Sequence, residues 1–199
     1  MLYRMQKQTI IMMGIQGSGK GTQVKLLGGH LQRDPDHSVF RFETGSAFRS
    51  LAEDISYTGG LVRTSIAEGK LQPLFLTVSL WANSFVKHYN GNQHVLIDGF
   101  PRTRAEAEVL HTAFVYYQLL PVTVIDLRVS DAIATERMKA RGRADDTEAG
   151  IAERVAWYKN SVAPILAWYT DHPEYNVISI DGERAIEPIH EDIVRQLSL

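Results

Sequence analysis

The sequence predicts an α/β fold in which a five-stranded parallel sheet lies between two layers of helices. Five short apolar runs rich in β-branched residues recur along the chain, and helical patterns separate them. Strands that alternate with helices form parallel sheets covered on both faces. The 199 residues are 44% hydrophobic and 22% charged, as in an ordinary globular protein. We therefore expect one domain over residues 1–199.

The strands are predicted from short β-rich runs that end at polar or turn-forming residues. The first run is apolar throughout and leads into a glycine-rich loop, and the third ends at an aspartate. The expected strands are Thr9–Met13, Val39–Phe42, His94–Ile97, Val122–Leu127 and Asn176–Ile180.

The helices are predicted from apolar residues at helical spacing. Pro164 is expected to kink the helix from Thr147, because proline cannot donate a backbone hydrogen bond. The apolar stripe of this helix, with Trp157 and Trp168, is expected to serve the core. The expected helices are Lys20–Gln32, Ser46–Ile55, Leu61–Glu68, Leu74–Tyr89, Ala105–Tyr117, Ala132–Ala140, Thr147–Tyr169 and Ile186–Leu197.

A glycine-rich loop, Gly14-Ile15-Gln16-Gly17-Ser18-Gly19-Lys20-Gly21-Thr22-Gln23, joins the first strand to the first helix. Glycines allow successive N–H groups to turn toward an anion, and a helix N-terminus adds partial positive charge. Lys20 adds a full charge, and Thr22 can offer a hydroxyl to Mg²⁺. Gly21 separates Lys20 from Thr22, which departs from the ordinary P-loop spacing. A simple glycine turn is the alternative, but the order of strand, loop, lysine and helix favours a phosphate site.

A second motif, Asp98-Gly99-Phe100-Pro101-Arg102-Thr103, follows the third strand. A carboxylate at the end of a buried strand is costly without a cation partner. Beside a P-loop that partner is usually Mg²⁺. Arg102 follows closely, where its guanidinium could bind a phosphate through two hydrogen bonds. The alternative is an aspartate that only caps the next helix.

Together the two motifs resemble those of the adenylate kinase family of nucleoside monophosphate kinases, in which the displaced threonine is usual. The resemblance covers nearly the whole chain. It implies a three-layer P-loop NTPase fold with a helical insert at about 44–73 that binds the acceptor nucleotide. It also implies a short lid at about 141–146, where Asp145 and Asp146 resemble the paired aspartates that close the family's lid.

The resemblance assigns residues to each substrate. Lys20, Arg102, Arg137, Arg143 and Arg154 match the family's catalytic residues, and Thr22 and Asp98 match those that hold Mg²⁺, directly or through water. The residues that match its ATP-binding positions are Gly17, Ser18, Gly19, Lys20, Gly21, Thr22, Arg137, Arg141 and Arg184. The residues that match its acceptor-binding positions are Thr44, Arg49, Lys70, Leu71, Gln72, Gly99, Arg102, Glu106, Arg143 and Arg154.

Three residues depart from the family pattern. Gln16 stands where the P-loop usually has proline, and Ser46 stands where aspartate is usual. Glu106 replaces a glutamine that hydrogen-bonds the acceptor adenine. An ionised Glu106 only accepts hydrogen bonds, so it could favour a base that offers donors, such as guanine or cytosine. The alternative is that Glu106 faces solvent or pairs with Arg104, with AMP still read by the backbone.

The expected function is reversible transfer of the γ-phosphoryl group of MgATP to a nucleoside monophosphate, with AMP first (ATP + AMP = 2 ADP). The alternatives are a kinase that prefers GMP, CMP or UMP, and a non-catalytic nucleotide-binding regulator. The chain has no cysteine, so we expect no zinc site in the lid. Its net charge of -2 argues against nucleic acid as a partner, and no segment reads as a membrane anchor. A cytoplasmic monomer is expected.

Overall fold

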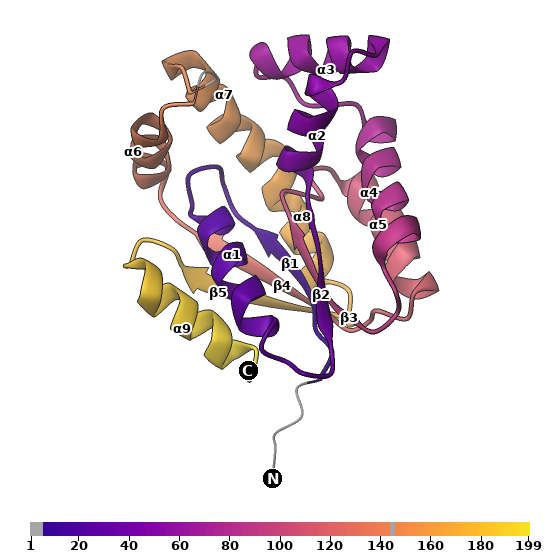
Figure 1. Cartoon of the computed structure of the whole chain (residues 1–199). Coiled ribbons are helices and arrows are strands. Elements are labelled where there is room, and N and C mark those ends of the chain that lie inside the picture. Colours follow the sequence, from indigo (N-terminus) through magenta and orange to yellow (C-terminus); the bar gives the residue numbers. More distant parts are fainter. Residues whose placement is uncertain (1–5, 144–145) are drawn as a thin grey trace.

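The computed structural model of the chain describes residues 6–143 and 146–199. Five strands form one sheet in the order β2-β3-β1-β4-β5, and every neighbouring pair is parallel. Helices cover both faces of this sheet (Figure 1). The predicted α/β fold with a five-stranded parallel sheet is therefore confirmed. The strands are β1 (Thr9–Met13), β2 (Ser38–Glu43), β3 (Gln93–Asp98), β4 (Val122–Arg128) and β5 (Tyr175–Asp181).

The helices also lie where the sequence predicts them, with ends that differ by a few residues. They are α1 (Lys20–Leu31), α2 (Thr44–Glu53), α3 (Tyr57–Ala67), α4 (Leu74–His88), α5 (Arg104–Tyr116), α6 (Asp131–Arg141), α7 (Glu148–Trp157), α8 (Ala163–Thr170) and α9 (Ile186–Gln196).

The long helix predicted over 147–169 contains a change of register. Between α7 and α8 the chain forms a π-helical turn, η1 (Tyr158–Val162), in which the N–H of Ala163 donates to the carbonyl of Tyr158. Pro164 follows at once and has no N–H to donate to Asn160. The wider turn thus lies where the proline interrupts the ordinary hydrogen-bond ladder.

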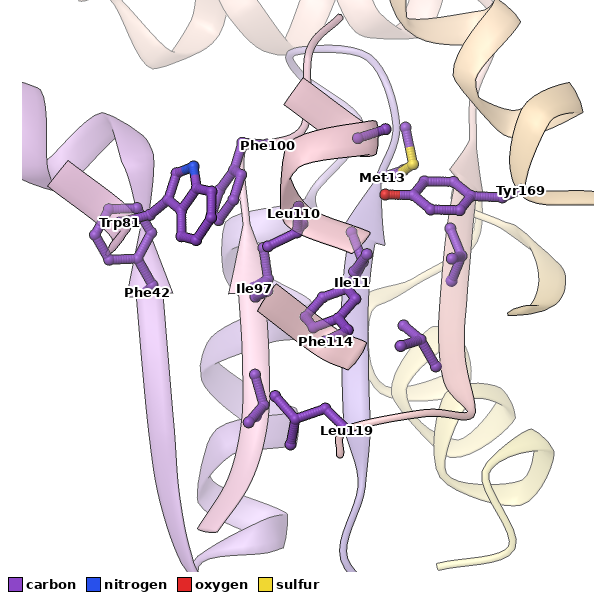
Figure 2. Close-up of a cluster of buried hydrophobic side chains, with 14 of the residues drawn as sticks. Ile11, Met13, Phe42, Trp81, Ile97, Phe100, Leu110, Phe114, Leu119 and Tyr169 are labelled. Carbon is purple, nitrogen blue, oxygen red and sulfur yellow. The ribbon is translucent and has the colours of Figure 1, made fainter. Parts of the chain in front are cut away.

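Alternate side chains of each strand build the core on the two faces of the sheet. On one face Ile11 and Ile97 pack with Leu110 and Phe114 of α5 and with Tyr169 of α8 (Figure 2). The other face packs against α1 and α9, in a cluster that contains Ile10, Leu96, Leu27, Ile125 and Ile193. All ten of these side chains are fully buried.

The topology brings both sequence motifs to the carboxyl edge of the sheet. β1 and β3 are neighbours, and Met12 is paired with Asp98. The loop after β1 therefore lies beside the end of β3, where α/β sheets bind ligands. The α2–α3 insert and the α6–α7 pair rise beyond this edge on either side (Figure 1).

Candidate active site

The glycine-rich loop is held in a conformation that only glycine fits well. Gly17 and Gly19 have φ angles of +85° and +96°. A Cβ on Gly14 would lie 2.5 Å from the carbonyl oxygen of Leu127, and one on Gly17 would lie within 3.0 Å of the carbonyl oxygen of Ala134 in α6. The loop therefore packs closely against the end of β4 and against α6.

Lys20, the first residue of α1, lies over this loop. Its Nζ donates to the carbonyl oxygens of Gly14 at 2.5 Å and Ile15 at 2.8 Å. Burial lowers the pKa of Lys20 to about 8. The buried hydroxyl of Ser18 in the same loop has no hydrogen-bond partner among the described residues. The desolvated ammonium at the N-terminus of α1 is a feature of an anion-binding site.

Two adjoining cavities, of about 520 and 450 Å³, open in front of the loop. The first is lined by Gly17, Gly19, Lys20, Gly21, Thr22, Asp98, Gly99 and Arg137. The second lies against the insert and is lined by Thr44, Lys70, Leu71, Gln72, Glu106 and Arg154. Seven residues line both cavities: Gln16, Gly45, Arg49, Arg102, Arg141, Arg143 and Trp157.

Asp98 ends β3 at the wall of the first cavity. Burial raises the pKa of its carboxyl group, while the ammonium of Lys20 opposes that shift. Thr22 lines the same cavity from the first turn of α1. A carboxylate and a hydroxyl are oxygen ligands of the kind that Mg²⁺ prefers, so this pair fits the predicted metal position.

Arg102 is fixed at the border between the cavities. Its Nε donates to the carbonyl oxygen of Gly99 at 2.6 Å. The Oε2 atom of Glu106 accepts from the backbone N–H groups of Arg102 and Thr103, and the Thr103 hydroxyl accepts from the Glu106 N–H at 3.2 Å. These bonds form a capping box at the start of α5.

The alternative reading of Glu106 as a surface residue is wrong. The side chain is buried at the second cavity rather than facing solvent. Arg104 instead pairs with Glu108, with 2.8 Å between Nε and Oε1. The reason is the Thr103-x-x-Glu106 spacing, which turns the carboxylate back toward the helix N-terminus. Whether the same carboxylate also reads the acceptor base stays a prediction.

Asp146, whose side chain is buried, contacts two arginines of the predicted lid and Arg154 of α7. The Asp146 Oδ1 atom lies 2.7 Å from Arg141 Nη2 and 2.9 Å from Arg154 Nη1. The backbone N–H of Arg143 donates to the other carboxylate oxygen. The hydrogen bond from Arg141 is the main cause that lowers the pKa of Asp146. Asp145, the other predicted lid aspartate, lies outside the described residues.

Arg137 of α6 and Arg49 of α2 both line the first cavity. Arg137 Nη1 donates to the carbonyl oxygens of Ser18 at 3.3 Å and Gly182 at 2.8 Å, so it ties the loop to the turn after β5. Arg49 Nη2 lies 3.1 Å from Glu43 Oε1.

Two residues predicted to bind ATP line neither cavity. Ser18 is buried within its loop, and Arg184 forms ion pairs with Asp181 and Asp192. Those two carboxylates hold the Arg184 guanidinium at the start of α9, away from the cavities.

Sequence reasoning missed two residues of the border between the cavities. Trp157 was interpreted as a core residue because it belongs to an apolar stripe, and Gln16 was noted only as a departure from the usual loop. Both line both cavities. The position of Gln16 inside the glycine-rich loop was a usable signal, because that loop was already predicted to form the phosphate site.

Comparison with known proteins identifies the family. The family model described as "Adenylate kinase" matches residues 12–174. The chain is 33% identical to an adenylate kinase of Corynebacterium aurimucosum over 181 residues, which cover 91% of this chain and 94% of the relative. It is also 33% identical to an adenylate kinase of Synechococcus sp. strain WH7803, over 92% of this chain and 94% of the relative.

The chain belongs to the adenylate kinase family. It is therefore a nucleoside monophosphate kinase, an enzyme that binds ATP and transfers phosphoryl groups between nucleotides. The class of enzyme predicted from the two motifs is confirmed, and the P-loop fold agrees with it. In the described part of the chain, no helix is both long and apolar enough to span a membrane.

A separate cluster of titratable residues lies at the opposite edge of the sheet. Asp34 Oδ2 lies 2.7 Å from His37 Nδ1 and 3.0 Å from His94 Nε2. The backbone N–H of Gln8 donates to His94 Nδ1, so neutral His94 carries its proton on Nε2 and donates it to Asp34. A metal ion on His94 Nε2 would require a proton on Nδ1, against the Gln8 N–H. The cluster is therefore built for hydrogen bonding, although its three ligand atoms lie within 4.8 Å of one another.

Proposed function

We propose that this adenylate kinase family member transfers the γ-phosphoryl group of MgATP reversibly to AMP and so forms two molecules of ADP. One observation carries the proposal. Two nucleotide-sized cavities meet at a border that Arg49, Arg102, Arg141 and Arg143 share. Phosphoryl transfer needs a donor and an acceptor phosphate in line, with positive charge around the group that moves.

The first cavity suits ATP. The exposed N–H groups of the glycine loop and the Lys20 ammonium would bind the β- and γ-phosphates. Thr22 and Asp98 would hold Mg²⁺, directly or through water, and the bound ion would neutralise charge on the transferring phosphates. Arg137 and Arg141 would contact the donor phosphates from α6.

The second cavity suits AMP. Arg49 and Arg102 would hold the acceptor phosphate, while Thr44, Lys70, Leu71 and Gln72 would contact the ribose and base. Glu106 lines the cavity and uses Oε2 for the helix cap. A single carboxylate oxygen beyond the cap can accept from one base donor, which the N6 amino group of adenine supplies. The second donor of guanine would find its partner oxygen already engaged.

The proposed mechanism needs no covalent enzyme intermediate. The arginines and the loop hold both phosphates for direct in-line attack, and their charge stabilises the transition state. Arg143 and Arg154 join this group when the lid closes, and closure excludes the water that would otherwise hydrolyse ATP. We further propose a cytoplasmic monomer with Mg²⁺ as its only metal, since the chain has no cysteine for a thiolate zinc site.

An acceptor panel tests this proposal. ADP formation is measured with MgATP and each of AMP, GMP, CMP and UMP, for the wild type and for Glu106→Gln. Glutamine keeps an oxygen for the cap but exchanges the free carboxylate oxygen for an NH2 donor. That donor can pair with adenine N1 but no longer accepts from N6, so the variant should retain its stability and change kcat/KM for AMP by less than about tenfold. Glu108→Gln, on the same helix but outside both cavities, should change nothing.

The outcomes separate the candidates. A wild-type preference for GMP or CMP over AMP would overturn the acceptor assignment. ATP binding without ADP formation from any acceptor would favour the non-catalytic regulator. Loss of AMP-dependent turnover by at least about 100-fold in Arg102→Ala would support the placement of the acceptor phosphate, because a lost charge contact in such a site costs about 3 kcal/mol or more.

A further inference from the structure

The border between the two cavities contains one aromatic side chain among the described residues that line both. Four of the seven border residues are arginines, and Trp157 is the only one with an aromatic ring. Trp157 ends α7, and its indole is half-buried against the main core cluster. It therefore lies between the hydrophobic interior and the point where the two substrates would meet.

The indole lies against Arg102. The guanidinium carbon of Arg102 is 5.8 Å from the centroid of the Trp157 ring, within the range of a cation–π contact. The Arg102 Nε already donates to the carbonyl oxygen of Gly99. The hydrogen bond to Gly99 thus holds the Nε edge of the guanidinium, and the indole makes a second contact with the same group.

An aromatic partner can stabilise the Arg102 cation and still leave its N–H groups free to bind a phosphate, which a carboxylate partner would not do. Burial lowers the pKa of Arg102, and the charge of Arg154 adds to that effect, although Glu106 and Asp98 oppose it. The cation is therefore partly desolvated, and a contact that favours the charge adds to the effect of these two carboxylates. A carboxylate would occupy the same N–H groups that a phosphate uses, as Asp146 does with Arg141. A ring stabilises the cation without occupying any donor.

The local helix geometry holds Trp157 in this place. The π-helical turn Tyr158–Val162 begins directly after it, and such turns are frequent at functional sites. Tyr158 and Val162 of this turn line the first cavity, while Val162 is also part of the core. The residues that follow Trp157 therefore connect the first cavity with the core.

We propose that Trp157 is a positioning residue that orients the Arg102 guanidinium, so that its terminal N–H groups face the acceptor phosphate. The inference rests on the proposed role of Arg102 in binding that phosphate. Trp157 itself need not touch the substrate. Its effect should therefore pass entirely through Arg102 and appear in the acceptor parameters.

The test compares Trp157→Leu, Trp157→Phe and Trp168→Leu in the full-length enzyme. Steady-state ADP formation gives kcat and the KM values for AMP and ATP, and thermal unfolding monitors stability. Trp157→Leu should lower kcat/KM for AMP by about 2- to 30-fold, the range of cation–π contacts, with the KM for ATP unchanged. Trp157→Phe, which keeps a ring, should recover most of the loss. Trp168→Leu removes a half-buried indole from α8 that lines neither cavity, and should leave the KM for AMP unchanged.

A double-mutant cycle completes the test. In an Arg102→Ala background, Trp157→Leu should have no further effect on kcat/KM for AMP. Full additivity of the two changes would overturn the proposal, as would equal effects on AMP and ATP. If Arg102→Ala leaves AMP kinetics intact, the proposed role of Arg102 fails. If Arg102→Ala is severe while Trp157→Leu is silent, the inference about Trp157 alone fails.

Discussion

Lys20 is expected to take up a proton when ATP binds at alkaline pH. Burial lowers the pKa of its ammonium group from 10.5 to about 8 in the nucleotide-free enzyme. Asp98 and Asp126 oppose this shift, whereas the charges of Arg102 and Arg141 add to it. A bound triphosphate places negative charge beside the amine, which favours the charged form.

The size of the effect follows from the two pKa values. At pH 9 a pKa of 8 leaves about 9% of Lys20 protonated, whereas the ordinary value leaves about 97%. If ATP restores the ordinary value, binding at pH 9 takes up about 0.9 proton, against about 0.1 at pH 7. Affinity should then fall about tenfold per pH unit from pH 8 to pH 10.5. The phosphates do not obscure this, because their own last pKa is about 6.

Calorimetric titration with MgATP measures the proton uptake. The binding heat at pH 9, compared between two buffers of different ionisation enthalpy, gives the number of protons. Lys20→Met should abolish the uptake and most of the affinity, whereas Lys25→Met, an exposed lysine on the same helix, should change neither. A wild-type uptake below about 0.2 proton at pH 9 would refute the reasoning.

Two further predictions concern stability. Gly17→Ala should lose about 2–4 kcal/mol of the free energy of unfolding, because its backbone is left-handed and the new Cβ meets the backbone of α6. Thermal or denaturant unfolding checks this against Gly29→Ala, whose Cβ meets nothing within 4 Å and which should not destabilise. For Asp34, burial would raise the pKa, but hydrogen bonds from the Asp36 N–H, His37 and His94 hold it at about 2. This folded pKa is below the ordinary 3.8. Above pH 4 the free energy of unfolding of the wild type should therefore exceed that of Asp34→Asn by about 2 kcal/mol. Melting curves should show that advantage disappear toward pH 2, and a constant difference down to that pH would contradict the assignment.

The sequence was sufficient for the fold because local patterns and topology agreed. The first strand was predicted with the bounds that it has, Thr9–Met13, and the other strands and helices lie within a few residues of their predictions, except that the π-helical turn divides the helix predicted over 147–169. The two motifs were predicted to lie at strand ends, and the pairing of Met12 with Asp98 brings them together. Apolar runs and glycine turns are local signals, so they need no knowledge of distant contacts.

The parts that escaped prediction depend on contacts between distant segments. The apolar stripe of the long helix continues through the π-helical turn, so its period gives no sign that Trp157 faces Arg102, 55 positions earlier in the chain. The cap made by Glu106 was readable from Thr103-x-x-Glu106, but the resemblance drew attention to the acceptor base instead. The Asp34 cluster joins a loop to β3 across 60 positions, and no local pattern marks it.

The arginines of the site are held in two ways that have different consequences for binding. Arg49, Arg141 and Arg154 pair with carboxylates, so a phosphate must compete with Glu43 or Asp146 for their N–H groups. That competition offsets part of the binding energy and ties their use to movement of the insert and the lid.

Arg102 and Arg137 are held by carbonyl oxygens, and Arg102 also by an indole, none of which carries a charge that repels phosphate. Arg102 lines both cavities, and Arg137 lines the first. A first phosphate can bind to them without breaking an ion pair. On the proposed mechanism, we expect the carboxylate-held arginines to become available only when both cavities are filled and closed, which is the condition under which transfer to a nucleotide outcompetes transfer to water.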